Sequence, residues 1–432
     1  MNVTLLIQCF PPLLCYAGGV AKRYYKLCKS LIEDNNYTVT IITPIDITQD
    51  NNELLKYLNS GKLIYKSIEG ILIKTLDGTV LGINVFSIST LYIIFKELLN
   101  TDICISDDIL GRQYIDIICK MCNVPTIFTT HTDITKLKTF RYKIVKLLWF
   151  FHNKFINYNI HATTSQIFAN KIKVNYIWPI LIWSDNFQKK NNINKDFLYE
   201  KINKYNKNKN FEGILFTCCR FSREKKLENL IRNIPEKLLL VIVGNTLDET
   251  YFKELSDQVN NHNNILLLRG MLNDKNLSIY YNIADLYLSA SDFETCGNCL
   301  LESWACGTPV AVQPEQGHLE HLENGINGFA IDFENKNAKE KLEKAFNSIN
   351  KLNIENITEK INNVNFSYDF HKKLIFPALL IENSYILRFL NLILFLLISL
   401  FGIPFVYFIL FLFGFLYKGL IKKTNNYIEK ND

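Results

Sequence analysis

The sequence lacks several patterns that would assign it to a familiar functional class. It contains no G-x-G-x-x-G fingerprint, which argues against a bound dinucleotide and therefore against an NAD-linked dehydrogenase or epimerase. It has no segment in which basic and aromatic residues gather, as a nucleic-acid-binding surface would require. Charged residues make up 21% of the chain and hydrophobic residues 48%, which is typical of a globular protein and not of a disordered one. A chain of 432 residues is long enough for two or three domains.

The cysteines form no recognisable metal-binding or disulfide pattern. There are eleven, an odd number, and nearly all lie in apolar runs, which favours small buried side chains in a reducing compartment. Cys296 and Cys299 have C-x-x-C spacing, but no second pair of cysteines or histidines nearby completes four ligands. We therefore expect these cysteines to pack in the interior, and we expect neither a metal site nor a redox pair.

Charge is distributed unevenly, and the C-terminal region has a long stretch without it. The net charge of +6 is scattered among Asn- and Lys-rich runs and favours an anionic partner, such as a phosphorylated substrate or an acidic membrane surface. No residue from Phe389 to Tyr417 is charged, and a helix that spans a bilayer needs about 20 apolar residues. We expect a membrane segment at 389–417, after a connector at 376–388 and before a basic tail at 418–432; a buried core helix is the alternative.

The expected membrane segment has two candidate forms. Gly402 and Pro404 divide it into halves of about 13 residues, each roughly 20 Å long as a helix. A single kinked span and a re-entrant hairpin both fit this division. Basic residues flank both ends, so the positive-inside rule gives no clean orientation. We expect a membrane protein whose preceding domains lie on the cytosolic side.

The first half of the chain alternates apolar strands with helices. Residues 1–10 predict a strand, not a signal peptide, because the segment lacks a basic start and is followed by Pro11 and Pro12. A glycine-containing loop, a helix to residue 36 and a second strand at 37–44 complete a βαβ unit. Similar strands recur at 101–107, 122–133 and 160–165. This pattern predicts an α/β domain with a parallel sheet at 1–185.

The pattern restarts after a polar segment. Residues 186–210 are rich in Lys and Asn and predict an interdomain linker. Strands and helices then alternate again, including a helix at 224–234, and predict a second doubly wound domain at 211–375. Two such Rossmann-like domains face each other across a cleft, and ligands bind at the carboxyl ends of the strands.

Several polar residues follow predicted strands and are candidates for this site. Gly18 and Gly19 would let backbone N–H groups approach an anion, although a glycine pair is more often only a turn. His131 would donate to a substrate, unless it is a hydrogen-bonded structural histidine. Arg220 and Lys225 would neutralise a diphosphate, unless they form a solvated start of a helix.

The segment 292–309 carries the strongest signal. It predicts a loop with Glu294, a helix with Glu302 eight positions later, and Gly297 at the helix N-terminus, where a phosphate would meet free N–H groups. Both carboxylates can face the cleft.

These stretches together resemble the retaining glycosyltransferases of family 4, which have the two-domain GT-B fold. The resemblance covers roughly residues 1–375 and runs in order through FPPLLCYAGGVAKRYYKLCKSL, HTD, CRFSREKKLENLI, SASDFETCGNCLLESWACGTPVAV and EQGHLEHLENGINGFAID. The fourth stretch is the most specific, because its two glutamates have the family's E-x7-E spacing. The sequence departs from the family at Cys219, Lys226 and Gln316, where glycine is usual, and at Cys296, where an aromatic residue is usual.

The resemblance implies a role for each matching residue. Glu302 would bind the nucleotide ribose, Glu294 the donor sugar, and Arg220 and Lys225 the diphosphate, while His131 would lie near the sugar. The catalytic set would be Glu294, His131, Arg220 and Lys225; the donor-binding set would be Gly18, Gly19, Arg220, Lys225, Glu294, Gly297, Asn298, Cys299 and Glu302. The donor would be a UDP- or GDP-linked sugar, and neither a metal nor another cofactor would be needed.

Within the family, several short stretches look most like sulfoquinovosyl- and glycosyl-diacylglycerol synthases. They are HTD, YKIVKLLWFFHNKF, IWSDNF and SDFET. This implies a membrane lipid, such as diacylglycerol, as the acceptor, which agrees with the apolar stretch at 389–417. A glycan or protein acceptor, and a catalytically silent membrane-bound subunit that binds a nucleotide-sugar, are the alternatives.

Overall fold

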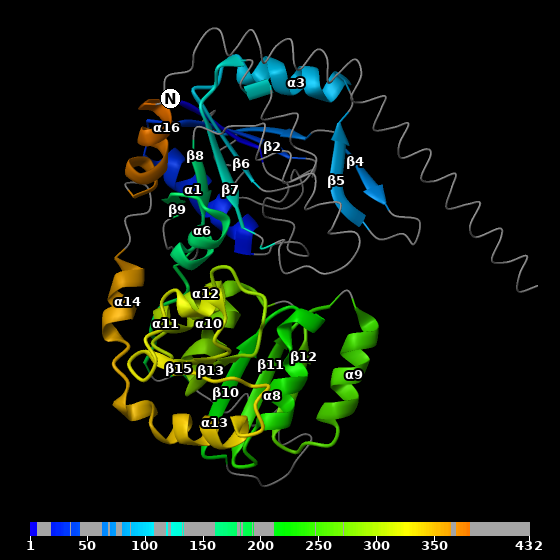
Figure 1. The fold of residues 1–432 in the computed structure, drawn as a ribbon, viewed down its shortest axis with the longest axis vertical. Helices are drawn as coiled ribbons and strands as arrows, with labels where there is room; N and C mark the ends of the chain where they lie inside the picture. The colour runs from blue at the N-terminus through cyan, green and yellow to red at the C-terminus, as the bar shows by residue number, and fades with distance from the viewer. Residues whose placement is uncertain are drawn as a thin grey trace, which may run out of the picture.

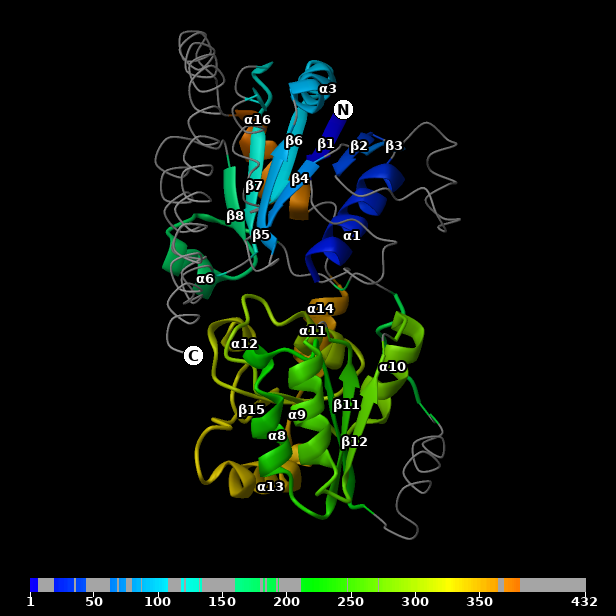
Figure 2. The ribbon, with the colours of Figure 1, turned by 90° about the vertical axis from the view of Figure 1, so that its right-hand side faces the viewer.

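The computed structural model describes two α/β domains (Figures 1 and 2). The described residues are 1–6, 19–34, 36–43, 63–67, 70–74, 80–86, 88–107, 118–119, 122–131, 133, 160–178, 182, 185–191, 193, 211–246, 248–270, 272–363 and 369–380. Among them, no helix is long and apolar enough to cross a membrane. The expected membrane segment at 389–417 and the basic tail lie outside the described residues, as do Gly18 and residues 194–210 of the predicted linker.

The first domain is built on a parallel sheet with the strand order β3-β2-β1-β6-β7-β8-β9. Its strands are β1 (Asn2–Leu6), β2 (Thr38–Thr43), β3 (Leu63–Ser67), β6 (Ile103–Asp107), β7 (Thr126–Thr130), β8 (Ile160–Thr163) and β9 (Tyr176–Ile177). An antiparallel pair is formed by β4 (Gly70–Lys74) and β5 (Val80–Phe86). The helices are α1 (Gly19–Glu33), α3 (Ile88–Leu98) and α6 (Gln166–Ile172). The predicted first strand is confirmed, because β1 pairs with β2 and β6 in the middle of the sheet.

The second domain has a parallel sheet with the order β12-β11-β10-β13-β14-β15, in which the strand order reverses between β10 and β13. Its strands are β10 (Gly213–Cys218), β11 (Leu238–Gly244), β12 (Ile265–Arg269), β13 (Leu286–Ser289), β14 (Val310–Val312) and β15 (Gly328–Ala330). The helical segments are η2 (Arg223–Lys225), α8 (Leu227–Asn233), α9 (Glu249–Val259), α10 (Asp274–Ile283), α11 (Asn298–Ala305), α12 (Gln316–Leu319), α13 (Ala338–Asn347), η3 (Ile349–Lys351) and α14 (Glu355–Asn362). Such a reversal is the place where ligands bind in open α/β sheets.

Burial explains why these strands can be predicted from the sequence. Every residue of β6, β7 and β11 is buried, as expected of parallel strands that are covered on both faces. Their sequences are therefore almost continuous apolar runs. The helix predicted at 224–234 is instead two pieces, η2 and α8, because Lys226 between them has a φ of 49° in the left-handed region. Glycine adopts this conformation most readily, whereas Lys226 adopts it with a full side chain.

The end of the described chain returns to the first domain. After α14, a π-helical turn, η4 (His371–Ile375), leads into α16 (Phe376–Leu380). Phe370 and Leu374 are fully buried in the first domain's core with Val3 and Trp178, and the rings of Phe370 and Trp178 have centroids 5.0 Å apart. The sequence assigned residues 211–375 to the second domain and did not anticipate this return. The predicted linker at 186–210 also differs from the structure, because Phe187 within it is buried in the core of the second domain.

Candidate functional site

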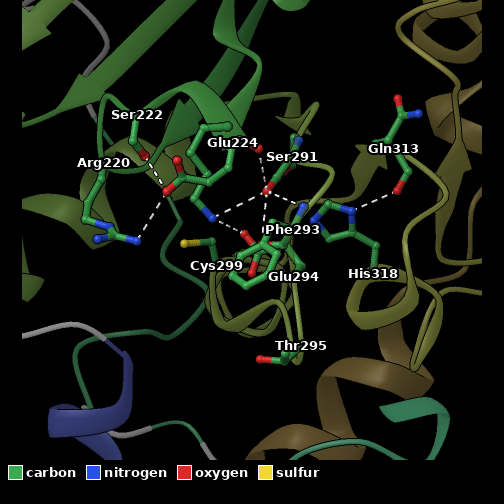
Figure 3. Close-up of polar contacts among 12 residues, drawn as sticks. Arg220, Ser222, Glu224, Ser291, Phe293, Glu294, Thr295, Cys299, Gln313 and His318 are labelled. Atoms are coloured by element: carbon green, nitrogen blue, oxygen red, sulfur yellow. Dashed lines mark hydrogen bonds and ion pairs between the residues drawn. The ribbon is translucent and has the colours of Figure 1, made fainter. Parts of the chain in front are cut away.

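Lys225 and Glu294 meet where the strand order of the second sheet reverses. Figure 3 shows Glu294 among its polar neighbours. Lys225 ends η2 in the connection that follows β10, and Glu294 lies in the loop after β13, the neighbouring strand. The ammonium group of Lys225 donates to Glu294 Oε1 and also lies 3.4 Å from Ser291 Oγ. Only 14% of the Lys225 side chain and 23% of the Glu294 side chain are exposed. The topology thus forms a largely buried ion pair from residues that are far apart in the sequence.

The ion pair keeps both groups charged. Burial alone would lower the pKa of Lys225, but the Glu294 carboxylate offsets this, and the pKa lies above its usual value. Burial alone would raise the pKa of Glu294, but Lys225 reverses the effect, and the pKa lies below its usual value. Glu294 is therefore an ionised hydrogen-bond acceptor near neutral pH and cannot serve there as a proton donor.

Backbone contacts on two sides hold the loop that carries Glu294. The N–H group of Gly317 donates to the carbonyl oxygen of Glu294 at 3.1 Å. A Cβ atom at position 317 would lie 2.7 Å from the Glu294 carbonyl group, so this approach requires glycine. From the first domain, the carbonyl oxygen of His131 accepts a 2.7 Å hydrogen bond from Thr295 Oγ1. The loop is therefore fixed by its own domain and by the opposite one.

The N-termini of two helices meet beside this loop. Gly297, with a φ of 69°, lies at the N-terminus of α11, as the sequence predicted, and the helix begins at Asn298. Gly19 is the first residue of α1 in the other domain, and a Cβ atom there would clash with the side-chain amide of Asn298. Helix N-termini present N–H groups that lack partners within the helix, and their dipoles favour negative charge. The arrangement can bind an anion between the domains.

The second carboxylate of the E-x7-E pair occupies a different environment. Glu302 lies within α11, is 4% exposed and accepts a 2.8 Å hydrogen bond from the hydroxyl of Tyr281 on α10. The sequence placed Glu302 in a helix and Glu294 in a loop, and both placements are confirmed. The contact with Tyr281 was not predicted, because it joins two helices through a buried hydroxyl group.

Arg220 and His131 differ in burial: the side chain of Arg220 is exposed, and that of His131 is buried. Arg220 is 78% exposed at the side-chain level and interacts with Glu224 at 3.4 Å; Figure 3 shows its guanidinium group directed toward that carboxylate. His131 is buried between the rings of Tyr24 and Trp178, and burial, together with the charge of Arg23, lowers its pKa to about 3. The imidazole is therefore neutral. The structure brings the His131 backbone to the Glu294 loop, whereas Arg220 lies at the exposed side of the Lys225 connection.

The cysteines of the C-x-x-C spacing are free thiols that face different partners. Cys296 Sγ accepts from the Arg23 guanidinium at 2.7 Å, and Cys299 Sγ lies 3.4 Å from the carbonyl oxygen of Cys218. Burial raises the pKa of the Cys299 thiol to about 12. Among the described residues, no group of three or more His, Cys, Asp or Glu side chains is arranged to hold a metal ion.

The sequence prediction missed four residues that shape this site. They are Arg23, Ser291, Tyr281 and His318, whose Nδ1 lies 2.8 Å from the Gln313 carbonyl oxygen (Figure 3). Ser291 and His318 lie within two of the stretches that resemble the family, but no role was assigned to them. Arg23 also lies within such a stretch, whereas Tyr281 lies outside all of them; both are on helices whose pattern gives no sign of a buried contact.

Comparison with known proteins identifies the second domain. Residues 199–360 match the family model described as "Glycosyl transferases group 1". The chain therefore carries a glycosyl transferases group 1 domain. This group 1 domain contains Arg220, Lys225, Glu294 and Glu302. The alpha-monoglucosyldiacylglycerol synthase of Acholeplasma laidlawii is 25% identical over 240 residues, which are 51% of this chain and 59% of the synthase. The chain thus matches less than two thirds of that relative.

Solved structures resemble the group 1 domain together with the first domain. A glycosyltransferase from Rickettsia africae ESF-5 has a TM-score of 0.62 at 17% identity, over 89% of this chain and 99% of the other. Anabaena Alr3699/HepE, solved in complex with UDP-glucose, has a TM-score of 0.59 at 17% identity, over 87% and 99%. At these identities the likeness shows the fold alone: two parallel-sheet α/β domains, consistent with the predicted GT-B fold.

Proposed function

We propose that this protein is a retaining glycosyltransferase that transfers a sugar from a UDP- or GDP-linked donor to a membrane lipid. The observation that carries the proposal is the ion pair between Lys225 and Glu294 beside the N-terminus of α11, within the group 1 domain. It places a cation, an ionised acceptor and free backbone N–H groups together at the reversal point of a parallel sheet.

In this proposal, the diphosphate of the donor takes the place of the Glu294 carboxylate as the partner of Lys225. Lys225 stays protonated and turns from Glu294 toward the phosphate oxygens, while the N–H groups of α11 bind them from the helix end. Arg220, which is exposed, moves onto the diphosphate from its contact with Glu224. Each well-placed donor stabilises the departing diphosphate by about 3–4 kcal/mol in the transition state. These groups supply the neutralisation, so we expect activity to persist in a chelating buffer.

Release of Lys225 leaves Glu294 able to accept hydrogen bonds from hydroxyl groups of the donor sugar. In this role Glu294 orients the sugar through the hydrogen bonds that its carboxylate oxygens accept. The neutral His131 lies across the domain boundary, near Thr295, and would contact the sugar from the other side. Retention would follow from attack on the same face of the sugar, assisted by the leaving phosphate. Glu302 would bind the ribose after exchanging its hydrogen bond with Tyr281.

Two observations support a lipid acceptor. The Acholeplasma laidlawii relative is named a synthase of a glycosylated diacylglycerol. The sequence also contains the uncharged stretch at 389–417, which we propose attaches the protein to a membrane as one span or a re-entrant hairpin, with both domains on the cytosolic side. A sulfoquinovosyl donor is the narrower form of this proposal. A glycan or protein acceptor, or a silent nucleotide-sugar-binding subunit, remains the alternative.

The test uses the purified full-length chain with labelled UDP- and GDP-sugars and a lipid extract. We expect nucleotide release and a labelled product in the organic phase, with the same anomeric configuration as the donor by NMR. Lys225→Met should abolish the product. Transfer to peptides or soluble glycans without a lipid product would disprove the lipid acceptor, and nucleotide-sugar binding without any transfer would favour the silent subunit.

A further inference from the structure

Arg23 extends from the first domain into the site of the second. It lies on α1 four residues after Gly19, so both residues lie on one face of the helix. Its Nη2 atom donates to Cys296 Sγ at 2.7 Å and to Asn298 Oδ1 at 2.9 Å. These two acceptors flank Gly297 at the N-terminus of α11. The guanidinium group is therefore held between the two helix N-termini, next to the Glu294 loop.

This guanidinium group is buried, and no carboxylate in the described part of the chain neutralises it. Arg23 is 3% exposed, its Nη1 atom is buried without a hydrogen-bond partner, and it forms no ion pair with a described carboxylate. Two exposed arginines of the second domain differ, because Arg223 pairs with Glu254 and Arg269 pairs with Glu249. Burying a cation without a partner is costly. A bound anion would satisfy the free N–H groups of Arg23 and remove this cost.

The identity of residue 296 makes room for the arginine. Cys296 Sγ is the atom that Nη2 approaches to 2.7 Å, and Cys296 is itself 6% exposed. An aromatic side chain at 296 would be much larger than a thiol and would extend into the volume that the guanidinium group occupies. Cysteine at 296 and arginine at 23 therefore form a matched pair across the domain boundary.

We propose that Arg23 binds an anionic group of the donor at this point, either the diphosphate or an acidic substituent of the sugar. The proposal rests on the proposed function, because it assigns a ligand to the same site. It adds a charged contact that only the first domain supplies. Donor binding would then require both domains, since Lys225 and Arg23 come from opposite sides of the boundary.

The test measures binding of UDP, UDP-glucose, UDP-glucuronate and inorganic pyrophosphate by calorimetry, with GDP-linked ligands if those are preferred. The variants are Arg23→Gln, Arg23→Lys and the control Arg232→Gln, an exposed arginine on α8. We expect Arg23→Gln to weaken binding about 10- to 100-fold, Arg23→Lys to weaken it less, and Arg232→Gln to leave it unchanged. Equal losses for all nucleotides would assign Arg23 to the diphosphate, and a loss for UDP-glucuronate alone would assign it to an acidic sugar.

The unfolding midpoint of the ligand-free protein separates binding from a structural role. Because Arg23 is buried and pairs with none of the described carboxylates, Arg23→Gln should leave this midpoint unchanged or raise it. A lowered midpoint with unchanged affinities would overturn the proposal. A wild-type chain that binds pyrophosphate but no nucleotide would refute the proposed function only, and Arg23→Gln must then weaken pyrophosphate binding. A wild-type chain that binds none of the ligands would refute both.

Discussion

The ion pair between Lys225 and Glu294 joins two loops that follow neighbouring strands and lie 69 positions apart in the sequence. Each side chain is mostly buried, and each holds the other in its charged form. Removal of either partner therefore changes two properties at once: the stability of the second domain and the charge available to a ligand.

We expect Lys225→Met to lower the free energy of unfolding by about 1–3 kcal/mol, because it leaves the Glu294 carboxylate largely buried without its cation. The same variant should lose at least about 100-fold in kcat/KM. Lys226→Met is the matched control, since Lys226 forms more exposed ion pairs with Asp292 and Glu334 and should cost less than about 1 kcal/mol with activity retained. Urea unfolding and turnover assays would measure both; equal losses in the two variants would contradict the role given to Lys225.

The buried imidazole of His131 should make stability depend on pH. Its pKa is about 3 in the folded chain and about 6.5 when unfolded, so below pH 6.5 the unfolded state binds a proton that the folded state does not. Above pH 6.5 His131 is neutral in both states and does not lower the free energy of unfolding. As the pH falls below 6.5, the free energy of unfolding decreases by up to about 1.4 kcal/mol per pH unit. In urea unfolding at several pH values, His131→Gln should show a shallower loss than the wild type. Parallel curves would show that the pKa of His131 is the same in the folded and the unfolded chain.

The close approach of Gly317 to the Glu294 loop should be needed for activity. In Gly317→Ala, the new Cβ would lie 2.7 Å from the Glu294 carbonyl group, so the loop must move. We expect at least a tenfold loss of turnover, because a displacement of about 1 Å in positioning groups can cost about 100-fold. Gly325→Ala is the control: with a φ of +80° it strains the backbone, but its Cβ would contact nothing within 4 Å, so it should lower stability and keep activity. Full activity in Gly317→Ala would show that the loop tolerates the shift.

The return of the chain to the first domain should contribute strongly to that domain's stability. Phe370 is fully buried against Trp178, so Phe370→Ala should lower the free energy of unfolding by about 3–5 kcal/mol. Phe376→Ala removes the same ring from a site that is 52% exposed and should cost less than about 1 kcal/mol. Hydrogen exchange in β1 should increase only in Phe370→Ala. Similar unfolding midpoints for the two variants would show that the return segment does not stabilise the first domain.

The sequence predicted most strands and the order of loops and helices around the site, because strands buried on both faces are read directly as apolar runs. It could not predict which residues meet. Lys225 and Glu294 come together only because β10 and β13 are neighbours in the sheet. The order of strands in a sheet cannot be predicted from the local spacing of apolar residues. The break at Lys226 was missed because a lysine gives no local sign of a left-handed conformation.

Arg23 was missed for a related reason. On an amphipathic helix, an arginine is normally a solvated residue, and only the second domain, 273 positions away, makes this one buried. Phe370 was likewise assigned to the second domain because its sequence follows that domain's last predicted helices. In both cases, the deciding contact is made by a part of the chain that the local pattern does not describe.

The adjacent positions of Trp178 and Phe370 have a mechanical consequence. One residue precedes the passage of the chain into the second domain and the other follows its return, so the two covalent connections start side by side in the first domain. Two neighbouring connections act as a hinge: they favour rotation of one domain relative to the other about a single axis. They oppose sliding or separation of the domains. The largest displacement on opening would then fall on contacts far from this axis, and the smallest on the packing around Trp178 itself.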